Sequence, residues 1–203
     1  MAKGKKSIVY PVTFMLIVTV VFTLSLSLLN EFTIDRINYN RDLKIRRTLL
    51  YVFDVEVEAY SGESTDAIYK RYIEERIVDG KKLYIAKDGD EAYGYAFPIE
   101  GNGLWGSIHG FAAVSTDYST LLGIDFISHN ETPGLGGRIS EPIFKDQFKQ
   151  LSLSGSEGDY IIFRPAIGGN VDTITGATGT AKAVREILNE DIHAFISHMK
   201  GDR

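Results

Sequence analysis

The stretch VDTITGATGTAKAV (residues 171–184) decides how the end of this chain folds, because it leads into an amphipathic pattern. Apolar residues recur at helical spacing through residues 183–196, which predicts a helix over 178–199. One small polar residue is enough to cap a helix, yet this entrance carries four threonines and a Gly-Ala pair. Free amides and the positive end of the helix dipole suit a phosphate group. The stretch therefore predicts a phosphate-binding helix start, with a simple helix cap as the alternative.

The segments before this helix alternate between strand and helix patterns. "KKLYIAKDG" and "EAYGYAFPIEG" read as two strands around a Gly-Asp turn. Further strands are expected at 107–116, 120–129 and 159–165, and further helices at 31–53, 64–79 and 141–151. This order predicts an α+β fold with a mostly antiparallel sheet and flanking helices.

The N-terminal region has the length and composition of a membrane-spanning helix. Residues 7–30 carry no charge, and a helix of this length measures about 36 Å against a hydrocarbon core of ~30 Å. Lys3, Lys5 and Lys6 precede it, and no A-x-A-like cleavage site follows. We expect a retained signal anchor at 1–30, a helical stalk at 31–60 and an extracytoplasmic domain at 61–203. By the positive-inside rule the N-terminus lies in the cytoplasm, with one pass through the inner membrane.

Charge and cysteine content narrow the function. The chain carries −5 and its first 30 residues carry +3, which leaves −8 for residues 31–203. An acidic domain of this kind is not expected to bind nucleic acid. The chain has no cysteine, so it cannot supply thiolate ligands to an iron–sulfur cluster or a zinc ion. If it handles electrons, an organic cofactor must carry them.

Two glycine-rich segments are the other candidates for chemistry. "GNGLWG" (101–106) satisfies G-x-G-x-x-G, but the segment that follows resembles a strand, which argues against a dinucleotide fingerprint. "HNETPGLGGRI" (129–139) combines a carboxylate, a hydroxyl and flexible backbone, which suits a binding loop as well as a plain surface turn. The spacing of the four histidines does not favour a metal site.

Together these residues resemble a known family. Asp172-x-x-Thr175-Gly176-Ala177-Thr178 is similar to the D-x-x-[S/T]-G-A-[T/S] sequence that flavin transferases recognise. "GNGLWGSIHGF" and "HNETPGLGGRI" resemble two further motifs of the RnfG/NqrC family of membrane-anchored flavin subunits. The order of the three motifs and the N-terminal anchor agree with that family. The resemblance covers roughly residues 8–198.

The resemblance implies a cofactor site. Thr178 would carry FMN through a covalent phosphoester bond, with Asp172 and Thr175 belonging to the transferase signal. It implies further cofactor contacts from the three motifs: Trp105, Glu131, Thr132, Leu135, Gly136, Gly176 and Ala177. Helical spacing puts Lys182 one turn beyond Thr178, so we expect it near the phosphate.

The resemblance also implies a role in an ion-translocating redox complex. The expected function is electron transfer within an Rnf-type complex (ferredoxin:NAD oxidoreductase), alongside an integral-membrane flavin subunit and iron–sulfur subunits. The chain would act in the translocase as one of its subunits, not as an enzyme by itself, and a flavin transferase would mature it. Two alternatives remain: an NqrC-type subunit of a sodium-pumping NADH:quinone oxidoreductase, and a membrane-anchored binding domain without redox activity.

Overall fold

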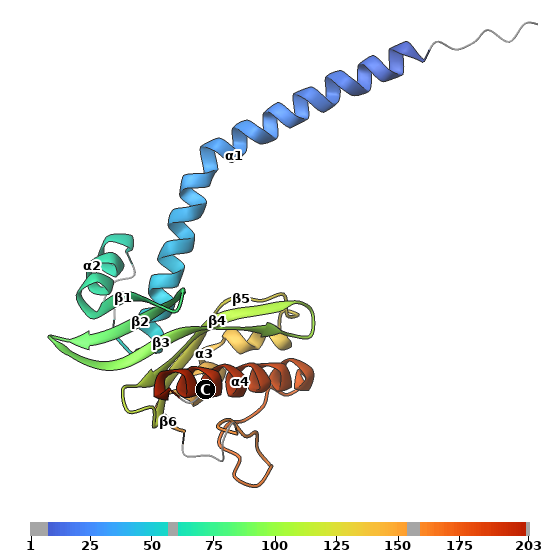
Figure 1. Cartoon of the computed structure of the whole chain (residues 1–203). Coiled ribbons are helices and arrows are strands. Elements are labelled where there is room, and N and C mark those ends of the chain that lie inside the picture. Colours follow the sequence, from blue (N-terminus) through green and yellow to red (C-terminus); the bar gives the residue numbers. More distant parts are fainter. Residues whose placement is uncertain (1–7, 57–60, 154–158, 202–203) are drawn as a thin grey trace, which may run out of the picture. The chain divides into compact units, whose positions relative to one another are not determined.

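The computed structural model describes residues 8–56, 61–153 and 159–201 (Figure 1). The chain divides into two units, Met1–Asp42 and Leu43–Arg203. The helices are α1 (Val9–Val52), α2 (Gly62–Tyr72), α3 (Pro142–Lys145) and α4 (Thr178–Lys200), with 3₁₀ turns η1 (Gly136–Ser140) and η2 (Asp146–Phe148). The strands are β1 (Ile73–Val78), β2 (Lys81–Asp88), β3 (Glu91–Asn102), β4 (Ser107–Ser115), β5 (Thr120–Ser128) and β6 (Leu151–Ser152).

The first unit consists of the N-terminal part of α1. Its apolar side chains are exposed, including Phe14, Leu16 and Phe22. Among the described residues, α1 is the helix that is long and apolar enough to cross a membrane. Lys3, Lys5 and Lys6, on which the expected orientation rests, lie outside the described residues.

The second unit is built on one antiparallel sheet in the order β1-β2-β3-β4-β5-β6, so each strand pairs with its neighbours in sequence. Short turns make this possible: Gly80 and Gly89 adopt positive φ at the two tight hairpins that flank β2. The α+β class and the mostly antiparallel sheet predicted from sequence are confirmed.

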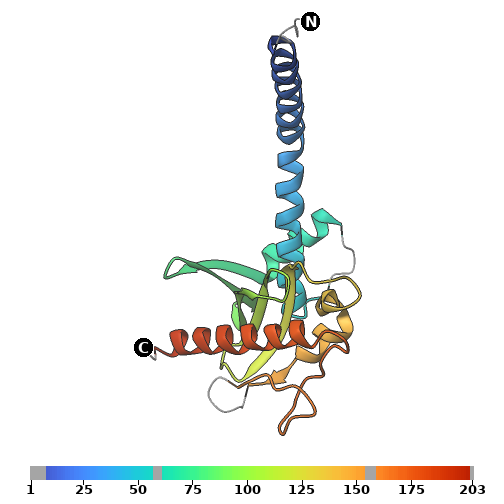
Figure 2. The same ribbon diagram turned by 90° about the vertical axis from the view of Figure 1, so that its right-hand side faces the viewer.

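Each face of the sheet carries its own apolar core. On one face α4 crosses the strands, as Figure 2 shows, and buries Val184, Leu188 and Ile192 against them. On the other face the core contains Leu49, Leu50 and Tyr69, from the end of α1 and from α2. Strand residues alternate between the two cores because successive side chains point to opposite faces of a sheet.

Two predicted elements differ from the structure. The helix expected at 64–79 ends at Tyr72, and residues 73–78 form β1 instead. The apolar spacing suits a helix, but pairing of β1 with β2 satisfies the backbone and overrides that local pattern. The strand expected at 159–165 does not form; residue Phe163 makes only an isolated bridge with Val171.

The segment at 159–165 is held by asparagine side chains instead of a neighbouring strand. The backbone amide of Ile161 donates to Asn189 Oδ1 (2.8 Å), and Asn189 Nδ2 donates back to the Ile161 carbonyl (3.1 Å). Asn170 binds the amide of Ile162 and the carbonyl of Tyr160 in the same way. These side chains supply the partners that an extended segment requires when it is not in a sheet.

Candidate functional site

The start of α4 is open to an anion. Ala177 is the N-cap residue, and its methyl side chain cannot accept a hydrogen bond from the first helical amides. Gly176 precedes it with a φ of 82°, which a glycine adopts without strain. The first amides of a helix have no partner inside the helix, so an external acceptor suits this position.

The four threonines of this entrance occupy different environments. Thr173, Thr175 and Thr178 are exposed, and Thr178 is the first residue of α4. Thr180 is 1% exposed, and its hydroxyl donates to Glu131 Oε2 (2.5 Å). Thr178 is therefore the threonine that combines an accessible hydroxyl with the first turn of the helix.

Glu131 joins the three sequence motifs inside the protein. Its carboxylate is 4% exposed for the residue as a whole, and Oε1 accepts from the amides of Leu104 (2.8 Å) and Trp105 (3.1 Å). The second oxygen accepts from Thr180, as above. The carboxylate is thus engaged by the chain itself, whereas the sequence suggested a direct cofactor contact.

Glycines are required where the motifs approach the carboxylate. A Cβ atom on Gly103 would lie 2.4 Å from Glu131 Oε1, and one on Gly136 would lie 2.4 Å from Thr180 Oγ1. Neither side-chain oxygen has room to move without losing a hydrogen bond. Gly136 is buried, so its place in the site is one of close packing.

An apolar platform flanks Thr178, formed by Leu104, Trp105 and Leu135. Their side chains are 59%, 67% and 47% exposed as residues, which is unusual for three large apolar groups so close to one another. A Cβ on Gly179 would lie 3.5 Å from Leu104 Cδ1, and one on Gly176 would lie 3.4 Å from Leu135 Cδ2. Leu104 and Leu135 therefore adjoin the residues on either side of the Ala177–Thr178 step.

The remaining predicted residues lie around this centre. Asp172 is exposed and pairs with Arg164 (Nη1–Oδ1, 3.0 Å), while its amide donates to Gln147 Oε1 (2.7 Å). Thr132 is exposed, and its carbonyl accepts from the amides of residues 135 and 137, which shapes the loop. Lys182 is exposed, and its ammonium group lies 3.6 Å from Glu186 Oε1, so a role at a phosphate requires this ion pair to open.

Sequence reasoning did not single out Leu104, Thr180, Arg164 or Gln147. Leu104 stands beside Trp105 in the same motif, so the pair of large apolar residues in a glycine-rich turn was an available signal. Thr180 follows Thr178 by two residues, which turns its side chain to a different side of the helix. For Arg164 and Gln147 we find no local signal, since they reach Asp172 only through the tertiary fold.

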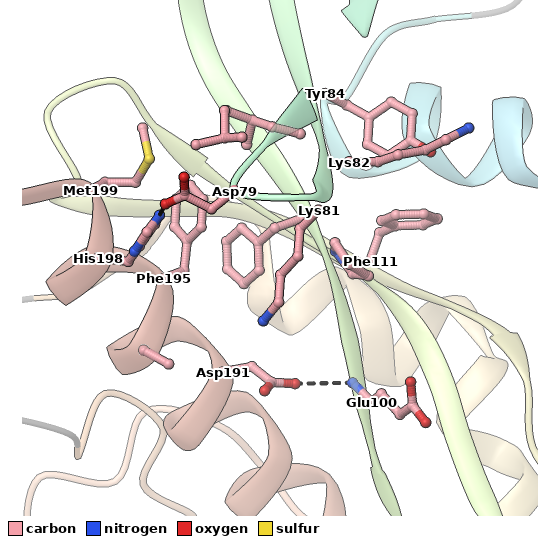
Figure 3. Close-up of a pocket in the computed structure, with 15 residues that line it drawn as sticks. Asp79, Lys81, Lys82, Tyr84, Glu100, Phe111, Asp191, Phe195, His198 and Met199 are labelled. Atoms are coloured by element: carbon pink, nitrogen blue, oxygen red, sulfur yellow. Dashed lines mark hydrogen bonds and ion pairs between the residues drawn. The ribbon is translucent and has the colours of Figure 1, made fainter. Parts of the chain in front are cut away.

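A separate groove of about 610 Å³ lies near the C-terminal end of α4 (Figure 3). It is lined mostly by apolar side chains, among them Phe97, Phe111 and Phe195, and by none of the predicted site residues. In Figure 3 an ion pair between His198 and Asp79 (3.1 Å) borders it. Size alone therefore does not identify the functional site of this chain.

Comparison with known proteins identifies the part of the chain that carries the motifs. Residues 103–193 match the FMN-binding domain family. This range begins in the turn of the platform and ends in α4, so it contains Glu131, Thr178 and the platform residues. The match supports FMN as the cofactor.

The relatives found by sequence carry one name, NqrC, the third component of the Na⁺-translocating NADH-quinone reductase. The chain is 36% identical over 114 residues to this component from Vibrio campbellii, covering 51% of this chain and 42% of that protein. The corresponding protein of Vibrio anguillarum is 37% identical over 118 residues, covering 53% and 44%. The matched region thus spans less than half the length of these curated relatives.

Solved structures share the fold. NqrC from Parabacteroides distasonis superposes with a TM-score of 0.66 at 25% identity, covering 78% of this chain and 92% of that one. Shewanella oneidensis NqrC gives a TM-score of 0.66 at 19% identity, covering 79% and 98%. The architecture built from β1 to α4 is therefore an established one.

Proposed function

We propose that this chain is a membrane-anchored flavin subunit of the RnfG/NqrC family that carries FMN as a phosphoester on Thr178. The observation that carries the proposal is the exposed Thr178 hydroxyl on the first turn of α4, between Leu104 and Leu135. The match of residues 103–193 to the FMN-binding domain supports the cofactor.

The residues present fit the two halves of FMN. A phosphate on Thr178 would lie at a helix start whose N-cap side chain provides no acceptor, where the helix dipole favours negative charge. A flat, largely apolar ring system would cover the exposed platform of Leu104, Trp105 and Leu135. When bound, FMN supplies the redox chemistry; the chain holds it and limits its contact with water.

We further propose that the chain serves as an NqrC-type electron carrier. The relatives found by sequence are named as components of the Na⁺-translocating NADH-quinone reductase, which favours this alternative over the Rnf-type complex expected from sequence. The apolar half of α1 would anchor the domain to the membrane, with the domain on the extracytoplasmic side. Purification of the complex from membranes, followed by assays with NADH and quinone or with ferredoxin and NAD, distinguishes the two.

The covalent attachment is tested by in-gel flavin fluorescence of the denatured full-length chain, expressed with and without a flavin transferase. We expect a fluorescent band that requires the transferase and disappears in Thr178→Ala. Thr173→Ala and Thr178→Ser are the matched controls and should keep the band, because they leave a hydroxyl at residue 178. A fluorescent Thr178→Ala band, or a dark wild-type band with active transferase, would refute the assignment.

A further inference from the structure

The contacts of Glu131 bring together segments that are far apart in sequence. Its carboxylate accepts from two amides of the 103–106 turn, 26 and 27 residues away, and from the hydroxyl of Thr180, 49 residues away. All three groups are donors, and the carboxylate is buried among them. Removing it would leave several buried donors without an acceptor at once.

From these contacts we infer that Glu131 is the positioning residue of the flavin site: it fixes the platform against the first turn of α4 without touching the cofactor. This inference rests on the proposed function for its flavin readout. The Leu104 and Trp105 amides are bound to one oxygen, so the backbone from which both side chains project is held in place. The other oxygen holds the helix that begins with Thr178.

Neighbouring groups hold Glu131 itself. Its own amide donates to His129 Nδ1 (3.3 Å), and the other ring nitrogen of His129 lies 2.9 Å from Ser140 Oγ. On the opposite side, the Gly103 amide donates to the Gly106 carbonyl (2.8 Å) and closes the turn that carries Trp105. A positioning group acts through its neighbours only when those neighbours are themselves held, and this condition is met here.

Two substitutions separate position from charge. Glu131→Gln keeps an oxygen that accepts from both amides and supplies an NH₂ group that can donate to the Thr180 hydroxyl, while it removes the charge. Glu131→Ala removes all three hydrogen bonds. Thr180→Val cuts only the link to α4 and serves if Glu131→Ala does not fold.

The chain contains a single tryptophan, Trp105, so intrinsic fluorescence reports on the platform without any cofactor. We would measure acrylamide quenching of Trp105 in the unlabelled full-length chain in detergent. The same variants, labelled by the transferase, would give the visible circular dichroism of the flavin, and thermal melting would verify folding.

The inference predicts wild-type quenching and flavin dichroism for Glu131→Gln. For Glu131→Ala it predicts a larger quenching constant and a loss of flavin dichroism. Thr180→Val should lose dichroism while the quenching of Trp105 stays near that of the wild type. Unchanged values in Glu131→Ala, or equal changes in Glu131→Gln and Glu131→Ala, would overturn it, the latter because charge alone would then be decisive. If the wild type is not labelled, the proposed function fails, whereas the quenching experiment still tests Glu131.

Discussion

At the scale of single residues, Asp191 shows how burial and hydrogen bonding oppose each other in this domain. The side chain projects from α4 towards β3, and its Oδ2 accepts from the amide of Glu100 (2.9 Å), as Figure 3 shows. Burial raises the pKa of the Asp191 carboxyl, and the Glu100 amide only partly offsets this. The folded protein therefore binds a proton here more readily than the unfolded chain does.

The pH dependence of stability follows from that direction. Because the pKa of Asp191 is higher in the folded state, stability falls as pH rises from the ordinary aspartate pKa through the raised value. Asp191→Asn keeps an oxygen for the Glu100 amide and removes the charge. We expect a higher melting temperature than wild type at pH 7, with the difference closing towards pH 4; a variant less stable than wild type at pH 7 would contradict this.

Asp117 provides a control with the opposite sign. Hydrogen bonds from Ser115 and from the amide and hydroxyl of Ser119 lower the pKa of Asp117 to about 2. Its stabilising effect is present above the ordinary aspartate pKa and is lost as pH falls towards that value of about 2. Asp117→Asn should accordingly be less stable than wild type at pH 7, and the difference should shrink in acid.

At the scale of elements, Lys145 ties three of them together. It projects from α3 and lies 2.5 Å from Asp125 Oδ1 of β5, and its Nζ lies 4.1 Å from the ring centroid of Tyr51 near the end of α1. The residue is buried, which makes the pair sensitive to loss of one partner. Lys149 has a similar ion pair with Asp54 but is more exposed.

Removal of the buried charge should be costly. Lys145→Met leaves Asp125 without its cation, and we expect about 3 kcal/mol of lost unfolding free energy, measured by urea denaturation. Lys149→Met is the exposed control and should lose about 1 kcal/mol or less. The double variant Lys145→Met/Asp125→Asn should recover part of the loss, since neither charge is then left unpaired; a loss in Lys145→Met no larger than in Lys149→Met would count against the role of Lys145.

The elements also show where local pattern is a sufficient guide. Strands β2 to β5 were predicted because each alternates or runs apolar between clear turns. Strand β1 was missed because Ile73 and Ile77 have helical spacing, and its strand conformation depends on β2. The 159–165 segment has the composition of a strand, but the amide side chains of Asn170 and Asn189 take the place of a partner strand.

At the scale of the whole molecule, the compact unit begins earlier than the stalk boundary drawn from sequence. Leu43–Arg203 forms one unit, and Leu49, Leu50, Val52 and Phe53 are buried in the core on one face of the sheet. Each fully buried side chain of this kind stabilises the fold by about 1.5–3 kcal/mol. Their sum is comparable with the ~5–15 kcal/mol by which a domain is stable.

Truncation tests this boundary. A chain of residues 43–203 should be soluble and should melt cooperatively, because it retains the end of α1. A chain of residues 54–203 lacks four buried side chains and should aggregate or show no cooperative transition. Thermal melting followed by circular dichroism compares the two; a stable 54–203 chain would show that the end of α1 is dispensable.

The sequence by itself determined the apolar anchor segment, the order of the central strands, the final helix and the threonine at its start, since each depends on local periodicity or on a short motif. It also brought the three motifs to one site through their resemblance to a family. Only the tertiary structure decided that Glu131 and Thr180 point inward and bind each other, while Leu104, Trp105 and Leu135 point outward. The physical reason is that the direction of a loop side chain depends on partners distant in sequence, and those partners are adjacent only after the sheet and α4 have packed.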